Sequence, residues 1–253
     1  MIILGDYHTH TKYSRRGHGK GTILENASVA ANKGLKQIAI TDHGFNHFMY
    51  GVRRKDTPEM REEILTAREV SGVDILLGVE ANLISLGGDI DLKEEDYENL
   101  DIILMGHHKL VNFEGIKNGC RLGLDNLLRS PFGPSKDRLN RNTTAFLKAI
   151  DKNPIDIITH LNYGCPTDTL AVAKLAKQKG VLIEINGKRI HFTDKELITM
   201  AQEGVKFIIN SDAHSPDRVG EVNNSINQII RLDIPTSLVV NLDKLLKFNK
   251  KRN

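Results

Sequence analysis

Seven short apolar runs recur along this chain, and polar residues of one chemical kind follow them. The runs begin at Met1, Gln37, Asp74, Ile102, Ile155, Val181 and Phe207, and the residues after them are His8 and His10, Asp42 and His43, Glu80, His107 and His108, His160, Glu184, and Asp212 and His214. Continuous apolar runs are typical of parallel strands that are covered on both faces. Imidazole and carboxylate groups placed after successive buried strands indicate a metal site.

The stretches between the apolar runs predict helices. Residues at helical spacing occupy 25–33, 61–70, 143–150, 167–179 and 193–202, and Gly34, Gly180 and Gly204 act as helix stops. Thr57 and Pro58 are expected to be the N-cap and the first residue of the second helix. Thr193 and Glu196 match a capping box. Alternation of strand and helix at this rhythm implies parallel strands joined by crossover helices.

The distribution of the polar residues favours a closed α/β barrel over an open sheet. In an open sheet the ligands gather at one switch point between two strands. In a barrel the carboxyl ends of all the strands meet at one mouth, and here polar residues follow nearly every run. A chain of 253 residues can bury the core of one such domain, so we expect residues 1–253 to form a single barrel domain.

Composition excludes several other classes of protein. The net charge of +3 does not by itself argue for nucleic-acid or membrane partners. No apolar run approaches the roughly 20 residues of a membrane span, and no secretory leader is recognisable. Cys120 and Cys165 form neither a disulfide framework nor a metal-type spacing, so we expect a cytoplasmic protein. The segment 109–142 is the longest irregular piece, and we expect a functional or mobile loop there, with its arginines as a lid.

Two pairs of residues have the spacing of ligands on a strand. His8 and His10 are two residues apart, so on an extended backbone their side chains point to the same face. Asp212 and His214 repeat that spacing with a carboxylate and an imidazole. Each pair alone is weak evidence, but together with the other strand ends they predict a metal centre.

These motifs resemble those of the PHP (polymerase and histidinol phosphatase) family of metal-dependent phosphoesterases. The resemblance rests on residues 6–11 (DYHTHT), 41–44 (TDHG), 106–108 (GHH) with 159–160 (TH), and 211–214 (SDAH), and it extends from Gly5 to about Leu246. It is closest to the stand-alone bacterial members. The resemblance implies a distorted, TIM-like barrel of seven strands, with three divalent ions at the carboxyl ends of the strands.

The resemblance also implies a ligand set. The first ion would be held by His8, His10, Glu80 and Asp212, the second by Glu80, His108 and His160, and the third by His18, His43 and His214. His18 precedes a glycine-rich stretch as in the family, although residues 14–17 look like a short insertion. The family's Gly-x-His pattern selects His108 over His107, which is expected to point elsewhere. Leu161 and Asn162 replace the Pro-Gly that often follows His160.

Nitrogen and oxygen ligands without a thiolate suit Zn, Mn or Fe in the +2 state. Such ions would bind phosphate oxygens and lower the pKa of a bound water, so that hydroxide attacks phosphorus near neutral pH. His18 or His214, or a metal-bound water, would protonate the leaving group. The cations expected to bind the substrate are Arg15, Arg16, Lys109 and Arg189. Of the remaining histidines, His47 is expected to be a solvated loop residue unless it lines the mouth, and His191 either lies near the surface or touches substrate.

The first hypothesis is a phosphatase that hydrolyses small phosphate monoesters, with histidinol phosphate or a sugar phosphate as the candidates that the family suggests. The alternative is a phosphodiesterase or nuclease that acts on nucleotides or single-stranded nucleic acid, although no basic stripe with interleaved aromatic residues is present. A third is a metal-binding module without enzymatic activity. The expected partner is a small phosphorylated substrate, with neither a membrane nor a stable nucleic-acid partner. The physiological substrate, the native metal and the oligomeric state stay open.

Overall fold

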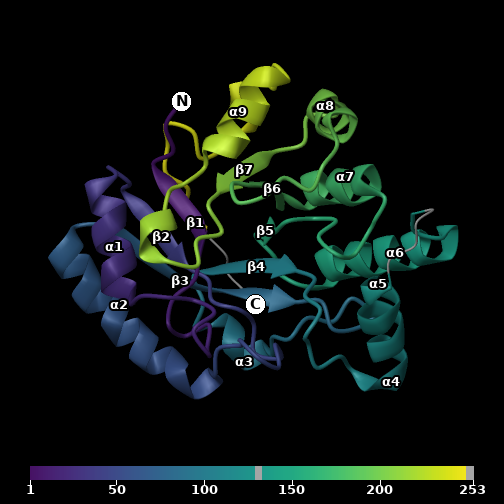
Figure 1. The fold of residues 1–253 in the computed structure, drawn as a ribbon, viewed down its shortest axis with the longest axis horizontal. Coiled ribbons are helices and arrows are strands. Elements are labelled where there is room, and N and C mark those ends of the chain that lie inside the picture. Colours follow the sequence, from purple (N-terminus) through teal and green to yellow (C-terminus); the bar gives the residue numbers. More distant parts are fainter. Residues whose placement is uncertain (129–132, 249–253) are drawn as a thin grey trace.

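The computed structural model describes residues 1–128 and 133–248, and within them seven parallel strands form one sheet in chain order (Figure 1). The strands are β1 (Gly5–Thr9), β2 (Gln37–Ile40), β3 (Asp74–Asn82), β4 (Ile102–Gly106), β5 (Ile157–Ile158), β6 (Leu182–Asn186) and β7 (Phe207–Asn210). The two edge strands meet where the His10 amide donates to the Ala213 carbonyl at 2.8 Å and Thr9 forms a bridge with Ala213. The sheet is therefore a nearly closed barrel, which confirms the predicted fold.

Helices connect the strands and cover the outside of the sheet (Figure 1). The longer ones are α1 (Ile23–Asn32), α2 (Thr57–Ser71), α6 (Lys136–Lys152), α7 (Thr169–Lys179), α8 (Asp194–Gln202) and α9 (Asn223–Arg231). Short helical segments are η1 (Arg54–Asp56), α3 (Glu94–Tyr97), α4 (Gly115–Asn118), the π-helical η2 (Gly119–Leu124), α5 (Asp125–Leu127), η3 (Pro216–Arg218) and η4 (Thr236–Leu238). Across the described residues, no helix combines the length and the apolarity needed to cross a membrane.

Several strands lie further along the chain than the apolar runs indicate. The first strand begins at Gly5, and Ile3 instead forms an isolated antiparallel bridge with Leu242. Glu80 lies within β3 and Glu184 within β6, where the sequence suggests that they follow the strands. These carboxylates are fully buried in the barrel. A strand that carries site residues on its inner face does not end where its apolar residues end.

Several predicted helices also have different limits in the structure. Helix α6 begins at Lys136, seven residues before the predicted start, and the Ser135 side chain accepts from the Arg138 amide at its N-terminus. Helix α7 begins at Thr169, two residues late. Thr57 lies inside α2, and Asp56 is its N-cap. The capping box of α8 is confirmed, because Thr193 and Glu196 bond each other's backbone amides.

The segment 109–142 contains more regular structure than expected. It includes α4, η2, α5 and the first part of α6. Arg141 pairs with Asp125 and Asp137, and Arg138 donates to backbone carbonyls of Asp125 and Leu128. Of the arginines expected to act as a lid, these two are therefore tied into the segment itself, while residues 129–132 lie outside the described part of the chain.

The barrel has two apolar cores, and their arrangement leaves one end for the site. The larger core packs the outer face of the sheet against the helices. The smaller core fills the barrel interior with Tyr7, Ala39, Leu104, Ile208 and their neighbours. Phe248 packs edge-on against the Tyr7 ring at 5.2 Å, so residues near the end of the chain close this side of the barrel. The polar cluster lies at the opposite end, at the carboxyl ends of the strands.

Candidate metal centre

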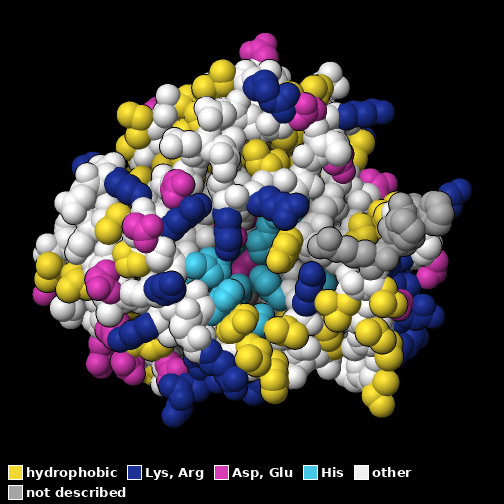
Figure 2. All heavy atoms as spheres, in the orientation of Figure 1, with side chains coloured by type: hydrophobic (Ala, Val, Ile, Leu, Met, Phe, Trp, Pro, Cys, Tyr) yellow, Lys and Arg dark blue, Asp and Glu magenta, His cyan; other side chains and the backbone are white. Residues whose placement is uncertain are grey.

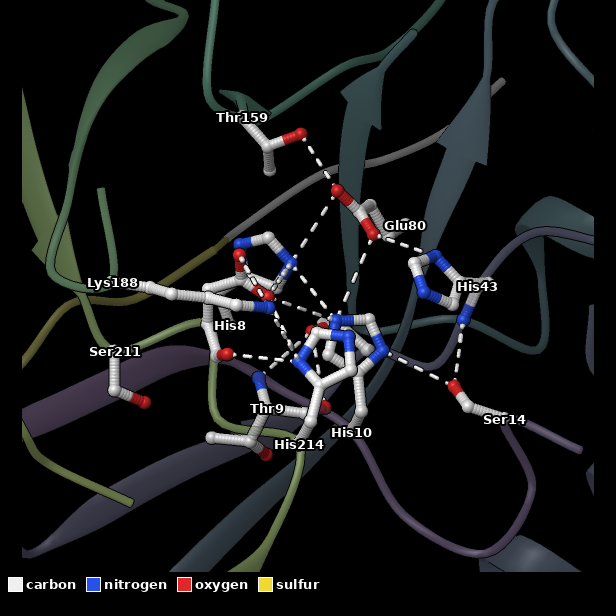
Figure 3. A network of polar contacts seen from close by, with 12 residues as sticks. His8, Thr9, His10, Ser14, His43, Glu80, Thr159, Lys188, Ser211 and His214 are labelled. Atoms are coloured by element: carbon white, nitrogen blue, oxygen red, sulfur yellow. Dashed lines mark hydrogen bonds and ion pairs between the residues drawn. The ribbon is translucent and has the colours of Figure 1, made fainter. Parts of the chain in front are cut away.

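Histidine and carboxylate side chains converge at the carboxyl ends of the strands, beneath a hollow in the molecular surface. Figure 2 shows histidines on the floor of the hollow, with lysine, arginine and hydrophobic side chains around them. Figure 3 shows His8, His10, His43 and Glu80 turned toward one another. His8, His10 and Glu80 are fully buried. Imidazole and carboxylate groups buried together in this way are ordinarily paired with one another or with a metal ion.

One group joins β1 to the segment after β7. His8, His10 and Asp212 each offer a ligand atom within 4.8 Å of the others. The two Nε2 atoms of His8 and His10 lie 3.1 Å apart, and the His10 Nε2 lies 3.5 Å from Asp212 Oδ1. Ligands of a tetrahedral ion with bonds of about 2.0–2.1 Å are separated by about 3.3 Å. The spacing of these three atoms therefore fits a shared divalent ion.

A second group centres on Glu80. Its Oε1 lies 2.7 Å from His160 Nε2, and its Oε2 lies 3.4 Å from His108 Nε2 and 3.0 Å from His43 Nδ1. The Glu80 Oε2 and both ring nitrogens of His43 are nevertheless buried without a hydrogen-bond partner. Buried polar atoms are ordinarily paired. A carboxylate oxygen of Glu80 and ring nitrogens of His43, buried side by side without hydrogen-bond partners, fit a site for a bound cation.

A third group surrounds His214. Its Nε2 lies 3.1 Å from His18 Nε2, and the His18 ring stacks on Tyr50 at 3.9 Å between centroids. His214 also offers a ligand atom together with His10 and His43. His43 thus lies between the second and third groups and offers a ligand atom to both.

Neighbouring polar groups fix which nitrogen of each imidazole is free. His8 Nδ1 lies 2.8 Å from Glu184 Oε1, and His108 Nδ1 lies 2.7 Å from Asn82 Oδ1. Both partners are acceptors, so each Nδ1 carries the proton and each Nε2 keeps its lone pair. Carboxylate or amide support of this kind orients ligating histidines in metalloproteins.

His10 is oriented through a longer relay. Asp42 accepts from the Ser14 hydroxyl at 2.6 Å and from the Thr11 hydroxyl at 2.7 Å. Since the Ser14 proton is directed to Asp42, the Ser14 oxygen accepts from His10 Nδ1 at 3.2 Å. Burial raises the pKa of Asp42 to about 6, against the hydrogen bonds from Ser14 and Thr11. The lone pair of His10 Nε2 again faces the cluster.

The imidazoles of the cluster differ in pKa. Burial lowers the pKa of His10 to about 3 and that of His18 to about 4, so both rings are neutral at pH 7. Burial also opposes protonation of His8 and His160, but carboxylates outweigh it, so Glu184 raises the pKa of His8 and Glu80 raises that of His160. Burial opposes ionisation of Glu80, yet His108, His8 and His160 hold its pKa well below its ordinary value. The pKa of Asp212 is likewise well below its ordinary value, because His8 and His10 outweigh its burial. Neutral imidazoles and ionised carboxylates are the forms that bind divalent metals.

Two of the cluster residues have backbone angles that side chains rarely adopt. His160 has a φ of 29° and Asp212 a φ of 51°. Both lie in the sparsely populated left-handed region, and such conformations persist where the surrounding structure determines them. Each lies two residues after its strand, β5 or β7, and its side chain belongs to the cluster.

Two of the four cations predicted to bind substrate line the cavity, and two do not. Lys109 and Arg189 line it, as does Lys188, which is not among the cations predicted to bind substrate. Arg15 and Arg16 are not among its lining residues, and the Arg15 guanidinium donates to the Gly51 carbonyl at 2.5 Å.

The other histidines also differ from expectation in part. His47 is buried, so its interpretation as a solvated loop residue is wrong. Its loop pairs with the segment after β4, where the Phe48 amide donates to the Leu110 carbonyl at 2.8 Å. Both His47 and His191 line the cavity. His107 points away from it and contacts the Leu122 carbonyl at 2.9 Å.

Comparison with known proteins shows one family. A family model described as "PHP domain" matches residues 6–219. A probable phosphatase of Caldanaerobacter subterraneus subsp. tengcongensis is 35% identical over 265 residues, which cover 98% of this chain and 91% of that protein. A probable phosphatase of Clostridium novyi is 30% identical, covering 100% of this chain and 96% of the relative.

Two solved structures share the fold. Histidinol phosphate phosphatase of Lactococcus lactis, determined with zinc, L-histidinol and phosphate, has a TM-score of 0.61 at 15% identity and covers 92% of this chain and 94% of its own. A putative histidinol phosphatase of Listeria monocytogenes has a TM-score of 0.59 at 13% identity, covering 87% of this chain and 99% of its own.

Proposed function

The chain belongs to the PHP domain family of metal-dependent phosphatases, and from that premise we propose that it hydrolyses small phosphate monoesters by means of a metal-activated hydroxide. The observation that carries this proposal is the convergence of imidazoles and carboxylates, with buried atoms of Glu80 and His43 that have no hydrogen-bond partner. We further propose that residues 1–253 act as a single catalytic domain. A cytoplasmic location stays a prediction.

We propose three divalent ions, of zinc, manganese or iron, with the ligands expected from the sequence. The proposed ligands are His8, His10, Glu80 and Asp212 for the first ion, Glu80, His108 and His160 for the second, and His18, His43 and His214 for the third. The Nε2 pairs at 3.1 Å in the first and third sets support this assignment. When bound, the ions supply Lewis acidity and lower the pKa of water to near neutrality.

The chain's own residues then bind and orient the ester. Lys188 extends toward the cluster, with its Nζ 3.4 Å from His214 Nδ1 and 3.8 Å from Asp212 Oδ2 (Figure 3). An ammonium group there is placed to contact a phosphate oxygen. Lys109 and Arg189 also line the cavity. We propose His18 or His214 as the proton donor to the leaving oxygen, with water as the alternative donor.

The proposal is tested by element-resolved metal analysis of protein purified without chelator, together with phosphate release from panels of monoesters and diesters. We expect close to three ions per chain and phosphate release from one or more monoesters of a panel that includes histidinol phosphate and a sugar phosphate. Cleavage of diesters or oligonucleotides alone would instead identify a phosphodiesterase. Fewer than two ions and no hydrolysis after addition of Mn or Zn would refute the proposal.

Two substitutions test whether the reaction takes place at this site. His10→Ala and Asp212→Ala each remove a proposed ligand of the first ion, and we expect turnover to fall by about 100-fold or more because the ion is lost or displaced. The circular dichroism spectrum should stay close to that of the parent. Unchanged turnover in both variants would remove this cluster from the reaction.

A further inference from the structure

The cavity above the proposed metal centre is much larger than a phosphate group. Its volume is about 600 Å³, within the range of sites that bind small organic molecules. The histidines and carboxylates of the cluster form its floor. The rest of the lining must therefore contact the alcohol part of an ester, and its chemistry indicates which alcohols fit.

One part of this lining is apolar and open to solvent. Tyr163, Leu110 and Leu127 line the cavity with exposed fractions of 41%, 49% and 45%. The Tyr163 ring lies 5.3 Å from that of His160 and 5.1 Å from that of His191, between centroids. Aromatic and aliphatic surfaces left exposed beside a cavity are surfaces that a bound ligand can cover. An aromatic or apolar group would lie against Tyr163, next to the reacting end.

A second part of the lining is cationic. Lys188 lies at the reacting end, whereas Lys109 lies beside the apolar wall, with its Nζ 6.0 Å from the Tyr163 ring centroid. In the part of the chain that the structure describes, neither Lys109 nor Arg189 has an ion-pair partner. Two unpaired cations near the alcohol part oppose a positive charge there and favour a neutral or negative one.

Acceptors for an amine or a set of hydroxyl groups are scarce. Among the described lining residues the carboxylates are Glu80 and Asp212, and both face the metal centre. The Asn186 side chain is also engaged: its Nδ2 donates to Glu184 and Asp212, and its Oδ1 accepts from the Lys188 and Arg189 amides. An ammonium group would be desolvated without a counter-charge, and sugar hydroxyls, which can accept from Lys109 and Arg189, would find few acceptors for their own protons.

We propose that this cavity selects phosphate monoesters whose alcohol part is aromatic or apolar and either uncharged or negatively charged. It discriminates against amino-alcohol phosphates, which include histidinol phosphate, and against sugar phosphates. This inference rests on the proposed phosphatase function and narrows its substrate class.

The test uses four esters of primary alcohols, whose similar leaving groups keep intrinsic reactivity comparable. They are 2-phenylethyl phosphate, the same ester with a para-carboxylate, the same ester with a para-aminomethyl group, and glucose 6-phosphate. With the metal-loaded protein we expect kcat/KM for 2-phenylethyl phosphate to exceed that for glucose 6-phosphate by about tenfold or more. We expect the carboxylate ester to exceed the aminomethyl ester by a similar factor.

Substitutions in the cavity wall test whether its cations cause the preference for negatively charged over positively charged esters. Lys109→Gln and Arg189→Gln should each move the carboxylate-to-aminomethyl ratio of kcat/KM toward one. Lys174→Gln, which removes an exposed lysine on α7 that pairs with Glu203, should leave this ratio unchanged. Tyr163→Ala should raise KM for 2-phenylethyl phosphate more than for methyl phosphate.

The outcomes separate this inference from the proposed function. Equal or better turnover of glucose 6-phosphate or of the aminomethyl ester would overturn the substrate class while leaving a phosphatase. A charge ratio that Lys109→Gln and Arg189→Gln both leave unchanged would overturn the role of these cations. Release of phosphate from none of the esters, with metal bound, would instead refute the phosphatase function itself.

Discussion

Single side chains at this site act through the groups that hold them. Glu184 is an example, because its carboxylate contacts His8 Nδ1 at 2.8 Å and accepts from the His160 amide and the Asn210 side chain, each at 3.0 Å. One buried carboxylate thereby orients residues from β1, from β7 and from the segment after β5. Burial opposes its ionisation, but His8 keeps the pKa of Glu184 below its ordinary value.

We predict that Glu184→Gln lowers the affinity for the first metal ion by about 10–100-fold. Glutamine lacks the negative charge that stabilises the His8 Nδ1–H. Its amide NH₂ would also face N–H groups of His8, His160 and Asn210, which need an acceptor. Competition with a chromogenic chelator measures the affinity. The matched control is Glu203→Gln on the surface, which should leave the affinity unchanged. Equal affinity in Glu184→Gln would show that His8 needs no such support.

The two cysteines should differ in reactivity. Burial raises the pKa of the Cys165 thiol, whereas Cys120 is exposed. Because the thiolate is the reactive form, iodoacetamide should modify Cys120 in the folded protein and Cys165 only after unfolding. Peptide mass spectrometry with and without guanidinium measures both sites. Rapid labelling of Cys165 under native conditions would contradict its burial.

The sequence reveals the proposed metal ligands better than it reveals the residues that orient them. His8 and His10 stand out through their spacing, and Asp212 and His214 through theirs. Glu184 is visible at a strand end, but its contact with His8 crosses the barrel and leaves no local signal. The burial of His47 depends on pairing between loops that are about sixty residues apart. The feature that points to Lys188 in the sequence is its position two residues after Asn186, where β6 ends.

At the scale of elements, capping signals locate helices well. In α8 the Thr193 hydroxyl accepts from the Glu196 amide at 3.2 Å, and Glu196 accepts from the Thr193 amide at 2.8 Å. We predict that Thr193→Ala lowers the free energy of unfolding by about 1 kcal/mol, because one amide of the first turn loses its acceptor. Urea denaturation measures this change.

Thr193→Ser serves as the control, since serine keeps the hydroxyl and should retain most of the stability. If Thr193→Ala and Thr193→Ser lose the same amount, the capping hydrogen bond does not contribute as described.

Other elements were less readable for physical reasons. The first turns of α6 consist largely of charged and polar residues and their buried face begins near Asn142, so apolar spacing reveals only the second half of this helix. No helix is predicted over α9, where Asn223 and Asn224 at the start resemble a turn. The sequence does carry a signal there, because Val222, Ile226, Ile229 and Ile230 have helical spacing, and Ile229 is buried in the structure.

At the scale of the whole molecule, the two apolar cores and the polar cluster are spatially separate. The cores do not use the ligand side chains, so the metal-free protein should remain folded. It should nevertheless be less stable, because several imidazoles and the Glu80 carboxylate are then buried without their cation.

We predict that removal of metal with a chelator abolishes turnover and lowers the melting temperature, and that both recover when zinc or manganese is returned. An ion present at about 1,000 times its dissociation constant stabilises the native state by about 4 kcal/mol. Calorimetry before and after chelation measures the difference. A melting temperature that does not change on loss of bound metal would mean that the ions contribute no stability.

The closure of β1 against β7 has a consequence for the order in which the site is synthesised and assembled. His8 and His10 leave the ribosome early, but they share their proposed ion with Asp212, which follows the last strand to be synthesised. Chains emerge and begin to fold from the N-terminus. The growing polypeptide therefore exposes histidines long before it can assemble the full set of ligands. The proposed site of the first ion is therefore complete only once the segment after β7 has been synthesised and packs against β1.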